Sequence, residues 1–314
     1  MKFIEKPSCP FEDRVEKEPN LKTIDVIMLT LDSENFLEKC LYSVYREIPV
    51  NKLIICDGGS KDETLEILKK FPRVVLFVKP EFRTTGKILE FLFSKVESEW
   101  FVLLDSDIIL EKGWYNEMYQ NQEKFDVLES GRRILAFHIF REDTAKLRDD
   151  DRSHDGCHLI RKNAVENFHC EDDYMSRYVD ILLRQVVEKS GYKYGKIKST
   201  LHIHNETERT PFQSDDEKNY RKLVIKEPEY IIIDKKKEEA HMQRHAKAIV
   251  KYLDPNFPWV KNTKWLDGHI RKLDRKWVEE NGKRWLARYD KVTSTSFSIK
   301  FSIKKKLAKI RDKK

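Results

Sequence analysis

Short apolar segments that alternate with segments of helical spacing constrain the fold of this chain more than any other feature. The runs IDVIMLT (24–30), LIIC (53–56), RVVLFV (73–78) and WFVLLD (100–105) have the length and composition of buried strands. Between the first two runs, apolar residues recur every three or four positions from Phe36 to Ile48, as in an amphipathic helix. The alternation predicts an α/β fold with a mostly parallel sheet and helices on both faces.

Acidic residues follow two of these strands, at the sheet edge where such folds bind ligands. Asp57 comes after the second run, before a turn at Gly58 and Gly59, and Asp105 and Asp107 come after the fourth. Ionised carboxylates at the end of a buried strand need a cation or hydrogen-bond donors. Mg²⁺ or Mn²⁺, held by one or two carboxylates and by substrate phosphates, would meet that need. The alternatives are a solvated turn or a helix cap.

A third acidic group lies further along the chain, in HCEDDYMSRYVDILLRQVVEKSGY (169–192). Glu171, Asp172 and Asp173 precede apolar positions with helical spacing, so we expect them at the N-terminus of a helix. A carboxylate there can serve as a catalytic base or merely cap the helix. Spacing alone does not decide between the two.

This ordered set of motifs resembles the family 2 glycosyltransferases, which have the GT-A fold, a Rossmann-like sheet flanked by helices. In that family a turn V-D-D/G-G-S-x-D closes on the nucleotide base, D-x-D after the fourth strand holds ribose and metal, and E-D at a later helix start supplies the base. The segments EKGWYNEMY (111–119) and DGCHLIRKNAVENF (155–168) also look like family segments. The resemblance covers roughly residues 24–210.

The resemblance implies transfer of a sugar, with inversion, from a UDP- or GDP-linked donor to a hydroxyl of a glycan or a lipid-linked acceptor. It implies that Asp172 or Asp173 is the catalytic base. The implied nucleotide-sugar-binding residues are Thr30, Asp57, Gly58, Ser60, Arg83, Lys87, Asp105 and Ser106. The implied ligands of the Mg²⁺ or Mn²⁺ cofactor are Asp105, Asp107 and His204.

Some details leave alternatives open. The first strand ends in TLDS, where the family more usually has an aromatic-asparagine pair. Arg83 and Lys87 equally fit a solvated helix start, and His204 equally fits a core or surface histidine. A non-catalytic nucleotide-sugar-binding protein on the same fold is an alternative function. A sugar nucleotidyltransferase is another, although it would usually carry a glycine-rich basic loop where this chain has TLDSENF.

Charged residues are distributed unequally along the chain. Residues 235–314 contain 24 Lys and Arg against 9 Asp and Glu, whereas residues 1–234 contain 37 against 45. We therefore expect a polar leader (1–22), a catalytic domain (23–234) and a basic extension of amphipathic helices with a Lys-rich tail (235–314). The extension contains four tryptophans: Trp259, Trp265, Trp277 and Trp285. Tryptophans beside cations predict a peripheral membrane contact; the alternative is that the tryptophans are core and the lysines solvated.

Cysteine usage and hydropathy predict the compartment. The five cysteines are an odd number without paired spacing, which is typical of a reducing environment: Cys9, Cys40, Cys56, Cys157 and Cys170. No run approaches the roughly 18 apolar residues of a membrane span, and the first 20 residues lack the apolar core of a signal peptide. We therefore expect a cytoplasmic protein, peripheral at most on the inner face of the membrane. The chain shows no nucleic-acid-binding motif, so no nucleic-acid partner is expected.

Overall fold

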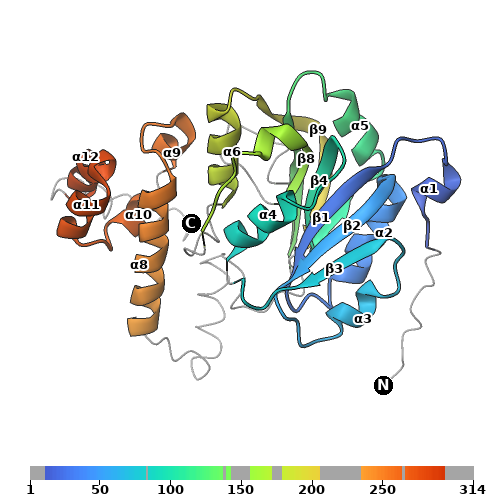
Figure 1. The fold of residues 1–314 in the computed structure, drawn as a ribbon, viewed down its shortest axis with the longest axis horizontal. Coiled ribbons are helices and arrows are strands. Elements are labelled where there is room, and N and C mark those ends of the chain that lie inside the picture. Colours follow the sequence, from blue (N-terminus) through green and yellow to red (C-terminus); the bar gives the residue numbers. More distant parts are fainter. Residues whose placement is uncertain are drawn as a thin grey trace.

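The computed structural model describes residues 11–82, 84–136, 139–142, 156–171, 179–205, 235–263 and 266–293. Strands and helices alternate along its first part (Figure 1). The strands are β1 (Ile24–Thr30), β2 (Val50–Asp57), β3 (Val74–Val78), β4 (Trp100–Asp105), β5 (Ile108–Leu110), β6 (Val127–Ala136), β7 (Ile139–Glu142), β8 (Cys157–Arg161) and β9 (Tyr194–Asn205). The helices of the first part are α1 (Arg14–Lys17), α2 (Leu37–Glu47), α3 (Thr64–Leu68), α4 (Thr85–Phe93), α5 (Trp114–Gln120), the 3-10 helix η1 (Lys162–Val165) and α6 (Val179–Lys189). The C-terminal helices are α8 (Lys235–Tyr252), α9 (Pro258–Asn262), α10 (Leu266–Ile270), α11 (Arg275–Asn281) and α12 (Lys283–Thr293).

The strands form one nine-stranded sheet. Its order is β3-β2-β1-β4-β8-β6-β9-β5, and β7 pairs with β6. β3, β2, β1 and β4 are parallel to one another, as the alternation of strands and helices predicts. Beyond β4 the sheet is mixed: β8 is antiparallel to β4 and to β6, β9 is parallel to β6, and β5 is antiparallel to β9. The mostly parallel α/β class is confirmed.

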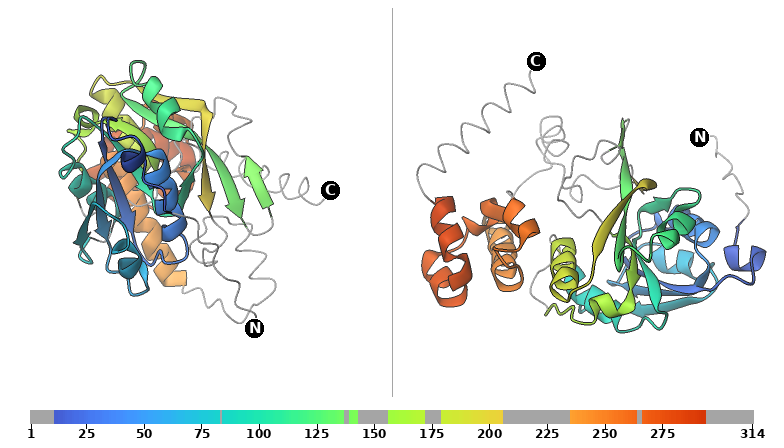
Figure 2. Two further views of the ribbon diagram at one scale, coloured as in Figure 1. Left: turned by 90° about the vertical axis from the view of Figure 1, so that its right-hand side faces the viewer. Right: turned by 90° about the horizontal axis from the view of Figure 1, so that it is seen from above.

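Side-chain alternation along the strands divides the core into two layers. On β1, Val26 and Met28 face one layer and Ile27 faces the other. The first layer contains apolar residues of α2, α3 and α5, and the second contains those of α4 and α6. Figure 2 shows helices on both sides of the twisted sheet. The carboxyl ends of the parallel strands are thereby fixed from both faces.

The C-terminal helices share the second core layer. Ile249 and Val250 of α8, and Leu253 directly after it, belong to the same buried cluster as Leu182 of α6. The α6 side chain of Gln185 also donates to the carbonyl oxygen of Tyr252 at 2.8 Å. The basic extension is thus packed against α6 instead of standing apart from it (Figure 1).

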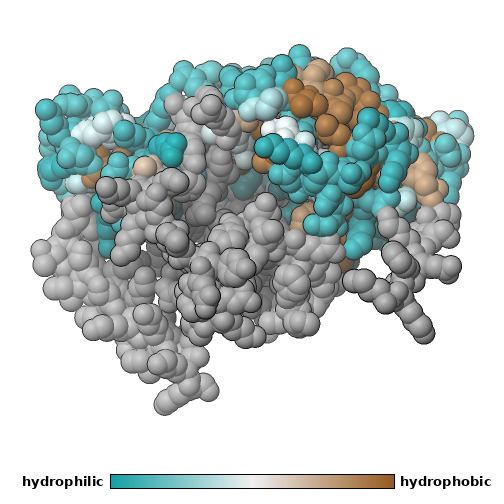
Figure 3. Space-filling view, turned by 90° about the horizontal axis from the view of Figure 1, so that it is seen from below, coloured by the Kyte–Doolittle hydropathy of each residue, from teal (hydrophilic) through white to brown (hydrophobic). Residues whose placement is uncertain are grey.

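The tryptophans of this region favour the core alternative. Trp285 is fully buried and donates from Nε1 to the Leu253 carbonyl oxygen at 3.0 Å. Trp259 and Trp277 are half-buried and pack against the same cluster, and Trp265 lies outside the described residues. In the view of Figure 3 the C-terminal helices present mostly hydrophilic side chains, whereas hydrophobic ones gather toward the other end of the molecule. None of the helices in the described ranges has both the length and the apolar character for a membrane span.

Replacing the buried tryptophan tests this assignment. We expect Trp285→Ala to lower the free energy of unfolding by about 3–5 kcal/mol, because it removes a large core side chain and leaves a cavity. Urea denaturation of the purified protein would measure the loss. Trp277→Ala, at a half-buried ring, should cost clearly less. Equal and small effects of both changes would contradict a core role for Trp285.

The cysteines of the described residues are buried free thiols: Cys40, Cys56, Cys157 and Cys170. Cys9 lies outside the described residues. Burial raises the pKa of the Cys56 thiol to about 11, with the charge of Asp57 adding to the rise. Buried, protonated thiols of this kind behave as small apolar side chains.

Candidate active site

The turn after β2 is organised around one buried carboxylate. Asp57 accepts hydrogen bonds from the hydroxyl of Thr30 at 2.8 Å, from the backbone N–H groups of Gly59 and Ser60 at 2.8 Å each, and from the hydroxyl of Ser60 at 2.5 Å. These four donors use both carboxylate oxygens of a side chain that is 0% exposed. Asp57 therefore holds the turn in this conformation, and Gly58, Gly59 and Ser60 of the turn are half-exposed.

The residue after β1 adds an apolar surface beside that turn. Leu31 is 58% exposed. A Cβ atom added at Gly58 would lie 3.4 Å from the Leu31 side chain and would cover part of it. The absence of a side chain at Gly58 therefore leaves this apolar surface open. The sequence-predicted residues Thr30, Asp57, Gly58 and Ser60 are thus brought together at the carboxyl ends of β1 and β2.

The D-x-D turn joins β4 to the short strand β5. Asp105 is the last residue of β4, and its backbone N–H donates to the Gly156 carbonyl oxygen at 2.7 Å. The Ser106 hydroxyl lies 3.0 Å from that of Ser33, which precedes α2. Ser106 and Asp105 are therefore tied to the ends of neighbouring elements.

Asp107 and His204 form a buried pair. His204 Nε2 lies 3.1 Å from Asp107 Oδ2, and each residue is 5% exposed. The strand register explains the contact, because Ile108 of β5 is opposite His204 of β9. The sequence placed both residues in the metal site, and the structure brings them together across 97 positions of the chain.

These two side chains suit a divalent cation that also binds substrate phosphates. Carboxylate oxygen and imidazole nitrogen are both ligands of Mn²⁺-type ions, and such sites commonly use one or two protein carboxylates and complete the shell with phosphate and water. Within the described ranges no three His, Cys, Asp or Glu side chains form a cluster that could hold a metal by themselves. The residues present therefore fit a site completed by the nucleotide, not a closed protein site.

Gly156 lies directly against the Asp105 carboxylate. A Cβ atom at Gly156 would be 2.1 Å from Asp105 Cγ and Oδ2, a distance that real contacts do not reach. The backbone φ of Gly156 is also positive, at 36°. The position of the Asp105 carboxylate thus depends on the absence of a side chain at Gly156.

We expect Gly156→Ala to weaken nucleotide-sugar binding by about tenfold or more, because the Asp105 carboxylate must move out of place. Gly113→Ala is the matched control. Gly113 has a φ of 84° but nothing within 4 Å of its would-be Cβ, so it adds backbone strain without the collision. Calorimetric titration of both variants would separate the two causes. Equal loss in both would show that strain, and not the Asp105 contact, is responsible.

The predicted donor contacts near residue 83 receive less support. Lys87, in the first turn of α4, forms an ion pair with Glu90 at 2.9 Å and is partly exposed. Arg83 lies outside the described residues. Helix α4 is capped by the Thr84 hydroxyl, which accepts from the Lys87 N–H at 3.4 Å. Lys87 in this arrangement matches the alternative interpretation, a charge at a helix start.

Of the acidic triplet at residues 171–173, the structure describes only the first residue, Glu171. Glu171 forms ion pairs with Lys251 of α8 at 2.5 Å and with His169 at 3.7 Å, at the surface. Asp172 and Asp173 lie outside the described residues, so their assignment as base stays a prediction.

One further carboxylate near the D-x-D turn was not among the residues expected from the sequence. Asp180 lies in the first turn of α6 and is half-buried. Burial, together with the negative charges of Asp105 and Glu129, raises its pKa from 3.8 to about 7, against the opposing charge of Arg132. Asp180 is therefore close enough to the D-x-D turn to sense the charge on Asp105. The only sequence signal was an acid at the start of a helix, within VDILL.

A buried polar network underlies Asp180. Glu129 is 1% exposed, accepts from the Tyr194 hydroxyl at 3.0 Å and pairs with Lys196 Nζ at 3.0 Å. His158 Nε2 lies 2.8 Å from the same hydroxyl. Burial lowers the pKa of His158 to about 4, so this imidazole is neutral. Glu129 therefore contributes a fixed negative charge next to the site.

Known proteins share this fold and part of this sequence pattern. The sequence model of the family described as Glycosyl transferase family 2 matches residues 25–177. A search of curated proteins found no match. Among solved structures, S. aureus TarS 1–349 in complex with UDP-GlcNAc is 13% identical, with a TM-score of 0.52 over 86% of this chain and 88% of that one. GalNAc-T7 with UDP, GalNAc and Mn²⁺ is also 13% identical, with a TM-score of 0.50 over 86% of this chain and 57% of that one.

The two kinds of comparison carry different weight. Identities this low show a shared fold alone, here the GT-A arrangement of a mixed sheet flanked by helices. The family match includes β1 to β4, the Asp57 turn and the D-x-D turn. Residues 25–177 of this chain match glycosyl transferase family 2, a family of enzymes that transfer sugars.

Proposed function

We propose that this protein transfers a sugar from a UDP-linked donor to an acceptor hydroxyl, with inversion at the sugar carbon. The observation that carries the proposal is the placement of Asp180, a carboxylate with a pKa near neutrality, within the field of Asp105 in the D-x-D turn. UDP is preferred to GDP because the structures of TarS and GalNAc-T7 that share this fold contain UDP or UDP-GlcNAc.

Asp180 would act as the general base. An acceptor hydroxyl becomes an effective nucleophile when a base within hydrogen-bond reach takes its proton during attack. A carboxylate with a pKa of about 7 is a stronger base than an ordinary aspartate and is still half ionised at neutral pH. The single displacement that follows, with the acceptor opposite the departing UDP, inverts the configuration at the sugar carbon.

Asp107 and His204, with Asp105 beside them, would hold the divalent cation and the donor's diphosphate. When bound, such a cation neutralises the charge that develops on the diphosphate as the bond to the sugar breaks. Thr30 and Gly58 border the surface on which the nucleobase of the donor would lie, and Asp57 holds the turn after β2 in place. We expect the protein's own groups to be preorganised, since most of them are buried and hydrogen-bonded.

Product analysis tests the proposal. The purified protein would be incubated with UDP-sugars, hydroxyl acceptors and Mn²⁺, and UDP release and the anomeric configuration of the product would be measured. Release of UDP with inversion is expected. Retention would contradict single displacement, pyrophosphate formed from UTP would favour a nucleotidyltransferase, and binding of UDP-sugar without UDP release at any acceptor would favour a non-catalytic binding protein.

The membrane contact proposed for residues 235–314 now depends on charge alone. Several cations on the described helices are exposed, including Lys247, Lys261, Lys272 and Lys283, whereas the three tryptophans that the structure describes in this region are in or against the core. We expect binding to anionic vesicles at low salt that weakens as salt screens the charges. Vesicle flotation would measure it, and no binding at low salt would contradict the contact.

A further inference from the structure

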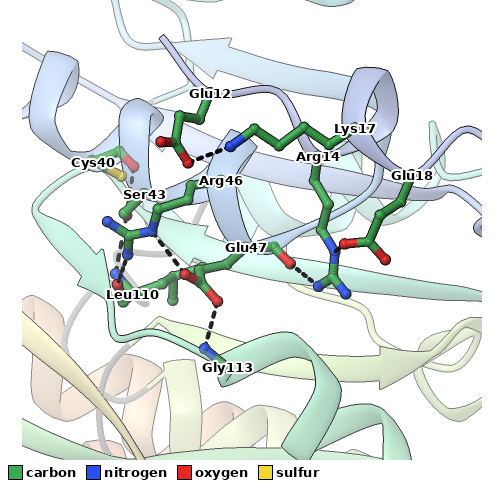
Figure 4. A network of polar contacts seen from close by, with 10 residues as sticks. All are labelled: Glu12, Arg14, Lys17, Glu18, Cys40, Ser43, Arg46, Glu47, Leu110 and Gly113. Carbon is green, nitrogen blue, oxygen red and sulfur yellow. Dashed lines mark hydrogen bonds and ion pairs between the residues drawn. The ribbon is translucent and has the colours of Figure 1, made fainter. Parts of the chain in front are cut away.

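We propose that three polar side chains of α2, Ser43, Arg46 and Glu47, position the D-x-D turn by holding the backbone of β5 and the start of α5. They are positioning residues and would not touch the substrate. The proposal rests on the proposed function, because it assigns a role to these residues in holding the nucleotide and the cation. Figure 4 shows the contacts.

Both backbone groups of Leu110 are bound by α2. The Leu110 N–H donates to the Ser43 hydroxyl at 3.0 Å, and the Leu110 carbonyl oxygen accepts from Arg46 at 2.7 Å. The Ser43 hydroxyl itself donates to the Cys40 carbonyl oxygen at 2.7 Å, which fixes its direction. Strand β5 is the last strand of the sheet in the order given above. Side chains of α2 therefore satisfy groups that an interior strand would bond to another strand.

Glu47 extends this hold to the start of α5. Its Oε2 accepts the Gly113 N–H at 2.7 Å, and its Oε1 accepts from Arg46 Nε at 2.8 Å. Arg14 of α1 in turn donates to the Glu47 carbonyl oxygen at 2.5 Å (Figure 4). The chain is thus fixed to α2 at two points within six residues of Asp107.

The segment before β5 is tied to the same helix. The Ser106 hydroxyl meets that of Ser33, just before α2, at 3.0 Å, and Cys40 Sγ lies 3.6 Å from the Asp105 carbonyl oxygen. On the other side, β9 supplies His204 to Asp107. The turn that carries both aspartates is therefore held between α2 and β9.

Stability alone does not account for this choice of residues. Glu47 is 5% exposed and lies in the last turn of α2, where the helix dipole disfavours a negative charge. The Arg46–Glu47 ion pair has one exposed partner, because Arg46 is 41% exposed, and such pairs add little to stability. What these groups provide is a fixed direction and length between α2 and the turn. Such precision matters most where ligands must be held within a fraction of an ångström.

The experiment compares Ser43→Ala, Glu47→Ala and Glu47→Gln with the wild type by calorimetric titration of UDP in the presence of Mn²⁺. We expect Ser43→Ala and Glu47→Ala to weaken UDP binding by about 10–100-fold, the range seen when supporting partners of a metal site are removed. Glu47→Gln should recover part of the affinity, because its amide oxygen can still accept the Gly113 N–H although its NH2 group cannot accept from Arg46 Nε. A role in folding alone would lower the melting temperature without changing UDP affinity at a temperature where the protein is folded.

Ser94→Ala is the matched control. The Ser94 hydroxyl donates to the Phe91 carbonyl oxygen at 2.6 Å, the same bond along a helix that Ser43 makes, but on the exposed surface of α4. This control should bind UDP as the wild type does. Wild-type affinity in folded Ser43→Ala and Glu47→Ala would overturn the proposal.

A second measurement needs no ligand. Amide hydrogen exchange in peptides covering residues 105–113 should be faster in Ser43→Ala and Glu47→Ala than in the wild type and in Ser94→Ala. Unchanged exchange in this segment would overturn the proposal even if the wild type did not bind UDP. Absence of UDP binding by the wild type would contradict the proposed function instead, so the two failures can be told apart.

Discussion

Asp180→Asn is expected to lower kcat of sugar transfer by about 10²–10⁴-fold, the usual contribution of a general base. The amide keeps the size of the carboxylate but cannot take a proton from the acceptor hydroxyl. UDP affinity should change little, because Asp180 acts on the acceptor and not on the diphosphate. Steady-state kinetics at saturating donor, together with calorimetric titration of UDP, would measure both quantities.

Asp172→Asn and Asp173→Asn are the decisive comparison. The sequence resemblance assigned the base to one of these residues, whereas we propose Asp180. If Asp180→Asn retains turnover while one of the other two loses it, the assignment from the sequence is correct and ours is wrong. If all three lose turnover with UDP binding intact, the acidic residues act together around the acceptor.

The pH dependence of the wild type should follow the same carboxylate. Its pKa is raised from 3.8 to about 7 in the folded protein, so the native state binds the proton more tightly than the unfolded chain does. Stability from this group is therefore full below about pH 4, falls as pH rises to about 7, and changes no further above that. Because the ionised form is the base, kcat/KM should rise over the upper part of this window. In Asp180→Asn the stability change should be absent, as denaturation at several pH values would show.

Asp107→Asn is expected to reduce transfer by at least about 10²-fold while leaving the fold as stable as before or more so. The expected effects are electrostatic. Asp107 is only 5% exposed, and burying a carboxylate lowers the free energy of unfolding unless hydrogen-bond partners or a bound cation offset the cost. An asparagine at this position can still accept from His204 Nε2, but it is a weaker ligand for the cation. Mn²⁺ titration in the presence of UDP, and urea denaturation without either, would measure the two effects.

Asp25→Asn provides the opposite case. Asp25 is also fully buried, but its carboxylate accepts from the backbone N–H groups of Glu97 and Ser98 at 2.8 and 3.0 Å and from Asn51 at 2.9 Å. We expect this change to lower stability and to leave Mn²⁺ affinity intact. If Asp107→Asn behaves like Asp25→Asn, with lost stability and retained Mn²⁺ affinity, then Asp107 has a structural role and does not bind the cation.

The sequence could predict those parts of the site that depend on the order of strands and helices along the chain. Alternation of strand and helix gives parallel strands, and parallel strands bring their carboxyl ends to one edge, so Asp57 and Asp105 could be placed there before any coordinates. The mixed half of the sheet was not predictable in the same way. The pairing of β6 with β8 and β9 joins residues that lie 29 to 70 positions apart, and no local pattern encodes which strands will meet.

The sequence by itself determined the sheet class, the turn around Asp57 and the position of the D-x-D acids, because these depend on residue periodicity and on which residues follow a buried strand. Only the tertiary structure decided that Asp180 lies within the field of Asp105 and Glu129, and that Trp259, Trp277 and Trp285 pack in or against the core. The physical reason is the same in both cases. A pKa and a buried surface are set by neighbours brought close in space, and those neighbours come from segments that are far apart in the chain.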